Sequence, residues 1–100
     1  MERRQNTNRN GGSWTPQEIK SVWQKGIEIP GLDKEIWRKD KCGYKMKFQE
    51  HGNRESSEGW EIDHITAVAN GGGDEISNLQ PLNWNNNVLK SDKKNWKCGQ

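Results

Sequence analysis

The sequence predicts a small single domain of the α+β class built around a strand–loop–strand–helix unit, and three features of residues 60–90 predict it. Apolar and polar residues alternate over residues 60–65, which is typical of a strand with one buried face. Residues 70–74 (NGGGD) predict a turn, because clustered Gly, Asn and Asp interrupt helices and strands. Residues 76–82 then predict a second strand, and Asn83 is typical of the N-cap of a following helix.

The elements before this unit are predicted to form a scaffold that covers it. Residues 15–18 (TPQE) make a capping box with proline at the first helical position, which predicts a helix that ends near Gly26. Residues 32–38 predict a second short helix with its apolar side chains inward. Alternation in residues 44–48 predicts a strand within a short hairpin.

Composition limits the size of the core. The 100 residues make one domain, but only 28% are apolar, 30% are charged and the mean hydropathy is −1.29. Tryptophan is expected to compensate, since each ring can bury ~150–250 Å². The six tryptophans, all predicted to pack in the core, are Trp14, Trp23, Trp37, Trp60, Trp84 and Trp96. Residues 1–13 are polar and basic and predict a disordered arm, which leaves residues 14–100 as the folded domain with its core at about residues 60–97.

The sequence shows neither an apolar run of membrane-spanning length nor the apolar region of a secretion signal. It therefore predicts a cytoplasmic protein with no membrane partner. The two cysteines, Cys42 and Cys98, form neither a metal-binding pattern nor a disulfide framework. They are expected to be reduced, although the sequence leaves their pairing open.

Three side chains of the central unit have the chemistry that phosphodiester hydrolysis needs. If the predicted helix packs on the strands, Asp63 and Asn87 offer hard oxygen ligands of the kind that suit Mg²⁺ or Mn²⁺. His64 is not needed as a ligand and can act as a general base near neutral pH. A base, a metal and open coordination positions together support hydrolysis. Singly, each residue is more often a cap or an interior residue, but their joint occurrence in this context favours the catalytic interpretation.

At these positions the sequence resembles the HNH endonuclease family, whose core is the ββα-metal fold. The matching segments are Asp63-His64-Ile65, Gly71-Gly72, Asn78-Leu79-Gln80-Pro81-Leu82, and Asn87 followed by Lys90. The resemblance implies a one-metal nuclease domain over residues 14–100. In it, His64 would activate the attacking water, while Asp63 and Asn87 would hold the metal that stabilises the leaving 3′ oxygen. Asn78 would fasten the loop and orient His64.

Two departures from the family pattern define the variant. The last motif position is Asn87 and not His, so the chain has the H-N-N form, and Ser91 stands where zinc-preferring relatives have a further His. The resemblance therefore implies Mg²⁺, with Mn²⁺ as the alternative. Many relatives also bind a structural zinc through two C-x-x-C pairs. Asn83 and Asn86 stand where one pair would lie, so no structural zinc is expected.

Basic residues near the unit are candidates for binding the nucleic-acid backbone. A predicted stripe at helical spacing consists of Lys90, Lys93, Lys94 and Lys97. An ordinary solvated helix face explains this stripe about equally well.

Two arginines and one strand face are further candidates. Arg38 and Arg54 are the arginines best suited to hold phosphate, although either could pair with a carboxylate instead. Lys45 and Lys47 share one face of the predicted strand, where plain exposure to solvent is the favoured interpretation.

Together these observations predict a metal-dependent endonuclease that cuts DNA by a one-metal mechanism. The choice of DNA over RNA depends on the resemblance alone. Two alternatives remain open: a non-catalytic DNA-binding module with the same fold, and a nuclease toxin domain that acts on DNA or RNA and has a cognate inhibitor protein. The complete set of motif residues argues against the first.

Overall fold

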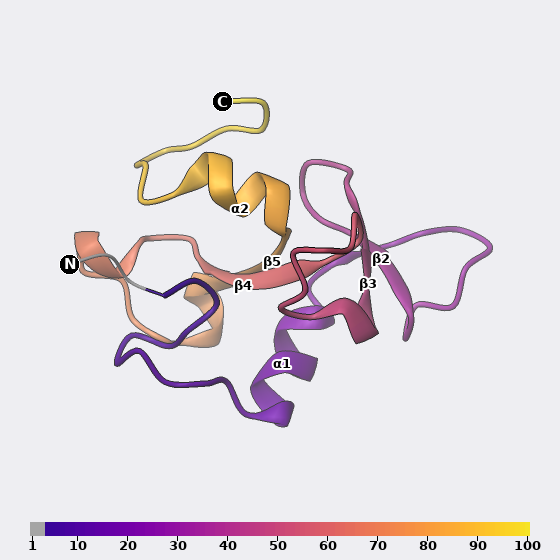
Figure 1. The fold of residues 1–100 in the computed structure, drawn as a ribbon, viewed down its shortest axis with the longest axis horizontal. Coiled ribbons are helices and arrows are strands. Elements are labelled where there is room, and N and C mark those ends of the chain that lie inside the picture. The colour runs from indigo at the N-terminus through magenta and orange to yellow at the C-terminus, as the bar shows by residue number, and fades with distance from the viewer. Residues whose placement is uncertain (1–3) are drawn as a thin grey trace.

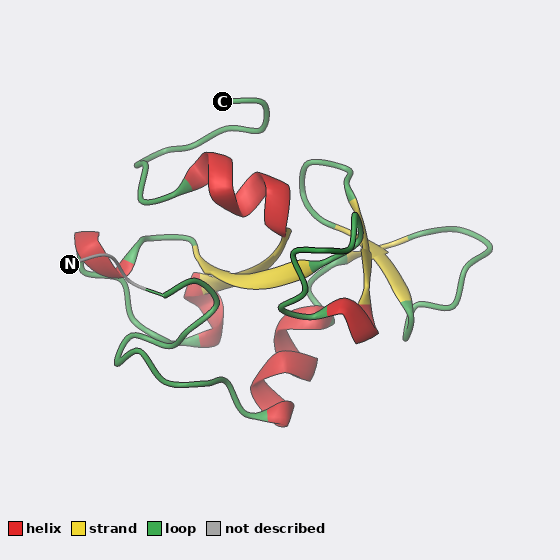
Figure 2. Cartoon of the chain, viewed as in Figure 1, coloured by secondary structure: helices red, strands yellow, loops and turns green. Residues whose placement is uncertain are grey.

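In the computed structural model, which describes residues 4–100, the chain folds into two antiparallel sheets and two α-helices (Figures 1 and 2). This confirms the α+β class. The larger sheet has the order β1 (Ile27–Glu28), β2 (Trp37–Lys39), β3 (Lys45–Lys47). The smaller sheet is the hairpin of β4 (Trp60–His64) and β5 (Leu79–Asn83).

The predicted strand–loop–strand–helix unit is present. β4 pairs with β5 from Trp60 opposite Asn83 to His64 opposite Leu79. Helix α2 (Trp84–Lys90) follows at once, and its N-cap Asn83 accepts a hydrogen bond from the backbone N–H of Asn85 at 3.0 Å. The second strand begins three residues later than predicted, because residues Ile76–Asn78 form a 3₁₀ helix.

The first predicted helix is also present as α1 (Pro16–Trp23). Thr15 and Glu18 form the capping box, with the Glu18 backbone N–H donating to the Thr15 hydroxyl at 3.1 Å and the Thr15 N–H donating to the Glu18 carboxylate at 2.8 Å. In Figure 1, α1 and α2 lie on opposite sides of the β4–β5 hairpin, so the hairpin is the middle layer of the molecule.

The second helix predicted over residues 32–38 is wrong. Residues 30–36 form turns, in which the Asp33 carbonyl accepts from Ile36 N at 3.0 Å and from Trp37 N at 2.8 Å. The chain then enters β2, which pairs with strands on both of its sides. Local helix propensity therefore yields to strand pairing. The predicted strand at residues 44–48 is present as β3.

The core lies between α1, the hairpin and β3. It consists of Trp14, Val22, Trp23, Met46, Trp60, Ile62 and Leu79. The rings of Trp23 and Trp60 meet at 5.1 Å between centroids. Trp96 is buried outside this cluster, whereas Trp37 and Trp84 are only half-buried. Four of the six tryptophans are therefore buried, and three of these pack in the central cluster.

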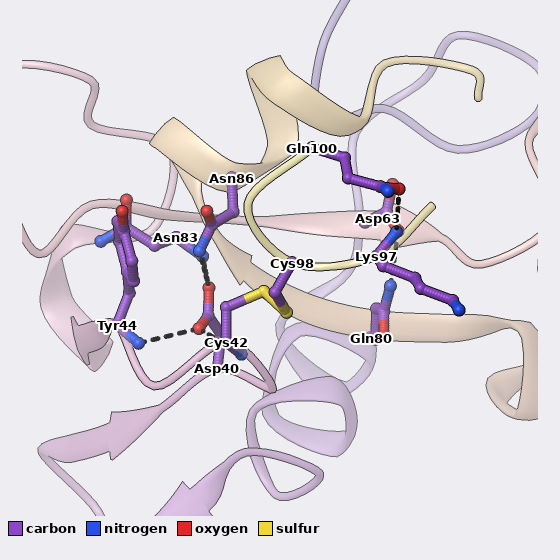
Figure 3. The surroundings of a disulfide bond; sticks show 10 residues. All are labelled: Asp40, Cys42, Tyr44, Asp63, Gln80, Asn83, Asn86, Lys97, Cys98 and Gln100. Atoms are coloured by element: carbon purple, nitrogen blue, oxygen red, sulfur yellow. Dashed lines mark hydrogen bonds between the residues drawn. A yellow bond between two sulfur atoms is a disulfide. The ribbon is translucent and has the colours of Figure 1, made fainter. Parts of the chain in front are cut away.

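The cysteines are paired, which corrects the expectation that they are reduced. The Cys42–Cys98 disulfide joins the turn between β2 and β3 to the C-terminal tail (Figure 3). Beside it lies the buried Asp40, whose Oδ2 accepts from Asn83 N at 3.0 Å and from Asn86 Nδ2 at 2.8 Å. Asn83, through its backbone N–H, and Asn86, through its side-chain amide, therefore both bind this carboxylate.

The N-terminal segment also departs from the prediction of a disordered arm. Residues 4–13 pack beside the hairpin, and Asn6 Oδ1 accepts from the backbone N–H of Ile62 in β4 at 2.8 Å. The rest of the predicted arm, residues 1–3, lies outside the described residues. Within residues 4–100 no helix is both long enough and apolar enough to cross a bilayer.

Candidate active site

Strand β4 distributes the site residues over two faces of the hairpin. Glu61 and Asp63 face α2, where they contact Asn87 and Lys90 respectively. His64 lies on the opposite face, with its ring 5.6 Å from that of Trp14. This is the alternation that the period of two predicted for adjacent residues at the end of a strand.

Asp63 is buried in a polar environment. Its side chain is 6% exposed, its Oδ2 accepts from Gln80 Nε2 at 2.8 Å and its Oδ1 lies 3.3 Å from the ammonium of Lys90. Burial raises the pKa of the Asp63 carboxyl, while the hydrogen bond from Gln80 and the charge of Lys90 oppose that rise. Lys90 also donates to the backbone oxygen of His64 at 3.0 Å, so one ammonium ties α2 to the end of β4.

Asn87 is oriented by Glu61, which lies two residues before Asp63 on the same face of β4. Asn87 Nδ2 donates to Glu61 Oε1 at 2.8 Å, so its carbonyl oxygen is directed away from that bond. Glu61 is itself held by two hydrogen bonds of 2.8 Å from the Arg54 guanidinium. These hydrogen bonds raise the pKa of Arg54. The chain Arg54–Glu61–Asn87 thus fixes the amide on the first turns of α2.

His64 is held by a carboxylate from the Gly-rich loop. Its Nε2 lies 2.8 Å from Oδ1 of Asp74, and the ring is only 9% exposed. Asp74 is positioned in turn by the backbone N–H of Arg9, which donates to both carboxylate oxygens at 3.0 and 3.2 Å. If Nε2 carries the proton that Asp74 accepts, Nδ1 is the unprotonated nitrogen.

The side chain of Asn78 bonds to the backbone of the Gly-rich loop. Its Nδ2 donates to the carbonyls of Thr66 and Gly73 at 3.1 and 2.8 Å, and its Oδ1 accepts from Thr66 N at 2.8 Å. It makes no hydrogen bond to the His64 ring, which Asp74 orients instead. The Asn78 carbonyl also accepts from Ile65 N at 2.7 Å, so Asn78 contacts the backbone beside His64 and not its ring.

One cavity brings the two faces together. Its volume is about 530 Å³, and its lining includes Asp63 and His64 from β4 and Asn87 from α2. Arg54 and residues 4–7 of the N-terminal segment complete part of its wall. The cavity lies along the edge of β4 that does not pair with β5, so residues from both faces of the strand reach it. A buried imidazole, a carboxylate and an amide oxygen therefore share one opening.

The model of the HNH endonuclease family matches residues 40–93, which is more than half of the chain and includes Asp63, His64 and Asn87. The chain belongs to the HNH endonuclease family. This membership indicates endonuclease-type activity. No curated protein and no solved structure matches the chain.

The donor set of this HNH domain fits a small hard cation. Asp63 and Asn87 offer one carboxylate and one amide oxygen, and Mg²⁺ typically takes one or two protein carboxylates and completes its shell with water and substrate phosphate. Both Asp63 oxygens already accept a contact, but a carboxylate oxygen has lone pairs for more than one partner. Within residues 4–100, no group of three or more His, Cys, Asp and Glu side chains forms a metal cluster.

Two of the residues predicted to contact nucleic acid are buried, which argues against that role. Arg38 is 6% exposed and donates to the backbone carbonyls of residues 24, 26 and 34, so its guanidinium connects α1 to β2. Lys90 is 3% exposed and binds Asp63 and His64. A buried charged group needs such partners, and burial keeps both side chains away from a phosphate backbone at the surface.

The remaining basic candidates are accessible, but not as a helical stripe. Helix α2 ends at Lys90, where Ser91 has a φ of 49°, and Lys93, Lys94 and Lys97 lie in exposed turns beyond it. Arg54 is 33% exposed and lines the cavity, with its guanidinium over the ring of Trp84 at 5.8 Å.

Sequence patterns missed three residues that organise the site: Glu61, Asp74 and Gln80. Glu61 had a signal, because the period of two places it on the same face as Asp63. Asp74 was assigned to a turn, and nothing in the local sequence connects it to His64 ten positions earlier. Gln80 meets Asp63 only because the two are opposite in the hairpin register.

Proposed function

We propose that this HNH protein is a metal-dependent endonuclease that hydrolyses DNA phosphodiester bonds, with His64 as the general base. The observation that carries the proposal is the shared cavity, in which the imidazole of His64 lies with the carboxylate of Asp63 and the amide of Asn87. Each of the three is held by a named partner, which is the preorganisation that catalysis by positioned groups needs.

In the proposed reaction, His64 removes a proton from the attacking water. The bond between Nε2 and Asp74 leaves Nδ1 to accept this proton, and it stabilises the imidazolium that forms. The oxygen of the water forms a bond to phosphorus as the bond to the 3′ oxygen breaks, so the products are a 5′ phosphate and a 3′ hydroxyl. The proton that His64 accepted balances the step when it is returned to solvent or to the leaving oxygen.

Asp63 and Asn87 are proposed to hold the divalent ion, with Mg²⁺ as the expected metal and Mn²⁺ as the alternative. When bound, the ion would supply charge stabilisation to the scissile phosphate and the leaving oxygen. Glu61 orients the ligand oxygen of Asn87 by accepting its Nδ2 proton, and Lys90 keeps the Asp63 carboxyl close to α2.

Arg54, Lys93, Lys94 and Lys97 are the proposed contacts to the DNA backbone near the cavity. The guanidinium of Arg54 retains donor capacity beyond its two bonds to Glu61, since an arginine carries five N–H groups. The three lysines are exposed in the turns that follow α2, close in sequence to Asn87.

Plasmid cleavage with purified protein tests the proposal. Wild type and His64→Ala are incubated with supercoiled DNA and Mg²⁺, Mn²⁺ or EDTA, with His51→Gln as the control because His51 does not line the cavity. We expect nicking or linearisation with either metal, none in EDTA, and a loss of about 10²- to 10⁴-fold in His64→Ala. Equal cleavage by His64→Ala would remove this residue from the mechanism.

Metal binding is tested separately by calorimetric titration with Mn²⁺. Asp63→Ala and Asn87→Ala should each weaken binding, while Lys93→Gln should not. DNA binding without cleavage under every metal condition would favour the non-catalytic module. Cleavage of RNA but not of DNA would favour the toxin-like alternative.

A further inference from the structure

A second basic surface lies on the three-stranded sheet. In the register of β2 and β3, Trp37 is opposite Lys47 and Lys39 is opposite Lys45. Residues directly opposite in an antiparallel pair point to the same face. The other face carries the buried Met46, so Trp37 and the three lysines form the outer face. We call these four residues the lysine face.

The lysines of this face are concentrated without compensating charge. The ammonium groups of Lys45 and Lys47 lie 5.3 and 5.4 Å from the centroid of the Trp37 ring, so one indole gathers two positive charges. Within the part of the chain that the structure describes, none of the three lysines forms an ion pair with a carboxylate.

The pairing of β2 with β3 places Lys39 directly opposite Lys45, which lowers the stability of the protein when nothing is bound. Like charges directly opposite one another destabilise a pair of strands. Trp37 holds Lys45 and Lys47 over one ring, which lowers the conformational entropy that those side chains would lose on binding. A surface that keeps cations in opposition and partly ordered is complementary to a polyanion, which would relieve the repulsion.

We propose that the lysine face binds the phosphate backbone of the DNA substrate outside the stretch that enters the cavity. The proposal rests on the proposed nuclease function, since that function supplies the polyanion. Figure 1 shows β2 and β3 at the opposite end of the long axis from the N-terminal segment that lines the cavity. The face would therefore contact phosphates remote from the scissile bond, and its loss should change binding more than chemistry.

The test is the salt dependence of DNA binding by Lys39→Gln/Lys45→Gln. Binding of a fluorescein-labelled 20-base-pair duplex is followed by anisotropy in EDTA, from about 50 to 200 mM salt. Lys20→Gln/Lys34→Gln is the matched control, because it removes the same charge from exposed residues elsewhere. Each lost phosphate contact should reduce the magnitude of the slope of log association constant against log salt concentration by about 0.9. Loss of two lysines should therefore reduce it by about 1.8.

Two further measurements separate this role from unfolding and from catalysis. The test variant should melt close to the wild type, because removal of a like-charge pair offsets loss of the contact between Lys45 and Trp37. Its kcat for plasmid cleavage should be unchanged while KM rises, because neither lysine lines the cavity.

A salt slope equal to that of the control variant would overturn the inference and leave the proposed nuclease function intact. A wild type that neither binds nor cleaves DNA would overturn both. Unchanged DNA binding with lost binding to poly-glutamate would assign the face to an acidic protein and also overturn the proposal.

Discussion

Oδ1 of Asp74 lies 2.8 Å from Nε2 of His64, although the two residues come from different elements of the central unit. Asp74 belongs to the Gly-rich loop, whose closure depends on hydrogen bonds from Asn78 to the backbone. The loop therefore supplies the carboxylate that fixes the ring of the proposed base. The Asp74 carboxylate also accepts from the backbone N–H of Arg9, so the N-terminal segment takes part in positioning the site.

Replacement of Asp74 by Asn should lower kcat while KM changes little. The amide can still bond to the ring, but it stabilises the imidazolium less than a carboxylate does. We expect a fall of about 10- to 100-fold, a part of the ~10²–10⁴ that a positioned base contributes. Steady-state cleavage kinetics measure the two constants. Partial recovery in Asp74→Glu would support positioning, whereas a rise in KM alone would assign Asp74 to substrate binding.

Replacement of Lys90 by Met should destabilise the fold without changing the salt dependence of DNA binding. Lys90 and Asp63 are 3% and 6% exposed, and removal of one partner leaves the other charge buried and unpaired. The expected loss is about 3 kcal/mol in the free energy of unfolding. Urea unfolding measures it, with the exposed Lys93→Met as the control. Equal stability of Lys90→Met and Lys93→Met would contradict the conclusion that the ion pair of Lys90 and Asp63 stabilises the fold.

The central unit could be predicted from sequence because its signals are local. The alternation in β4, the turn residues of the loop and the N-cap Asn83 are each signals that span only a few residues. The structure contains the strand, the loop and the helix that they predict. The helix predicted over residues 32–38 was wrong because β2 pairs with two other strands, and those strands lie outside the segment from which the helix was predicted. Local propensity carries no information about such partners.

In the site, as in the fold, local signals were predictable and contacts between separate segments were not. The motif names Asp63, His64 and Asn87, and the structure lines one cavity with them. What the sequence could not supply is the set of partners that orient them, since Asp74 and Gln80 meet their targets only after the loop closes and the hairpin register is set. The burial of Lys90 could not be predicted for a related reason, because helical spacing does not reveal which side chain is covered.

The disulfide should contribute substantially to stability. Cys42 and Cys98 are 56 residues apart, and a cross-link of that span removes chain entropy worth about 4 kcal/mol from the unfolded state. Cys42→Ser/Cys98→Ser should therefore melt well below the oxidised wild type, by roughly 15 °C or more at about 4–8 °C per kcal/mol. Calorimetry with and without reductant measures this. A reductant effect in the double variant equal to that in the wild type would show that the bond is not its cause.

Stability should fall as the pH drops below about 6.5, and His51 should be a cause. Its ring lies 4.8 Å from that of Trp60, and its Nε2 is 3.0 Å from Nδ2 of Asn6. Burial lowers the pKa of His51 below its ordinary value of 6.5, while the charge of Glu61 opposes that shift. Between these two pKa values the unfolded chain binds more protons than the folded protein, so acid favours unfolding.

The replacement His51→Gln separates this contribution from that of the carboxyl groups. Burial raises the pKa of Asp63 above its ordinary value of 3.8. Taken by itself, Asp63 therefore increases stability as the pH falls from this raised pKa to 3.8. Because both proteins contain Asp63, the difference in unfolding free energy between wild type and His51→Gln isolates the histidine. As the pH is lowered from 7 to 5, the wild type should lose more unfolding free energy than His51→Gln. A constant difference over this range would exclude His51 as the titrating group.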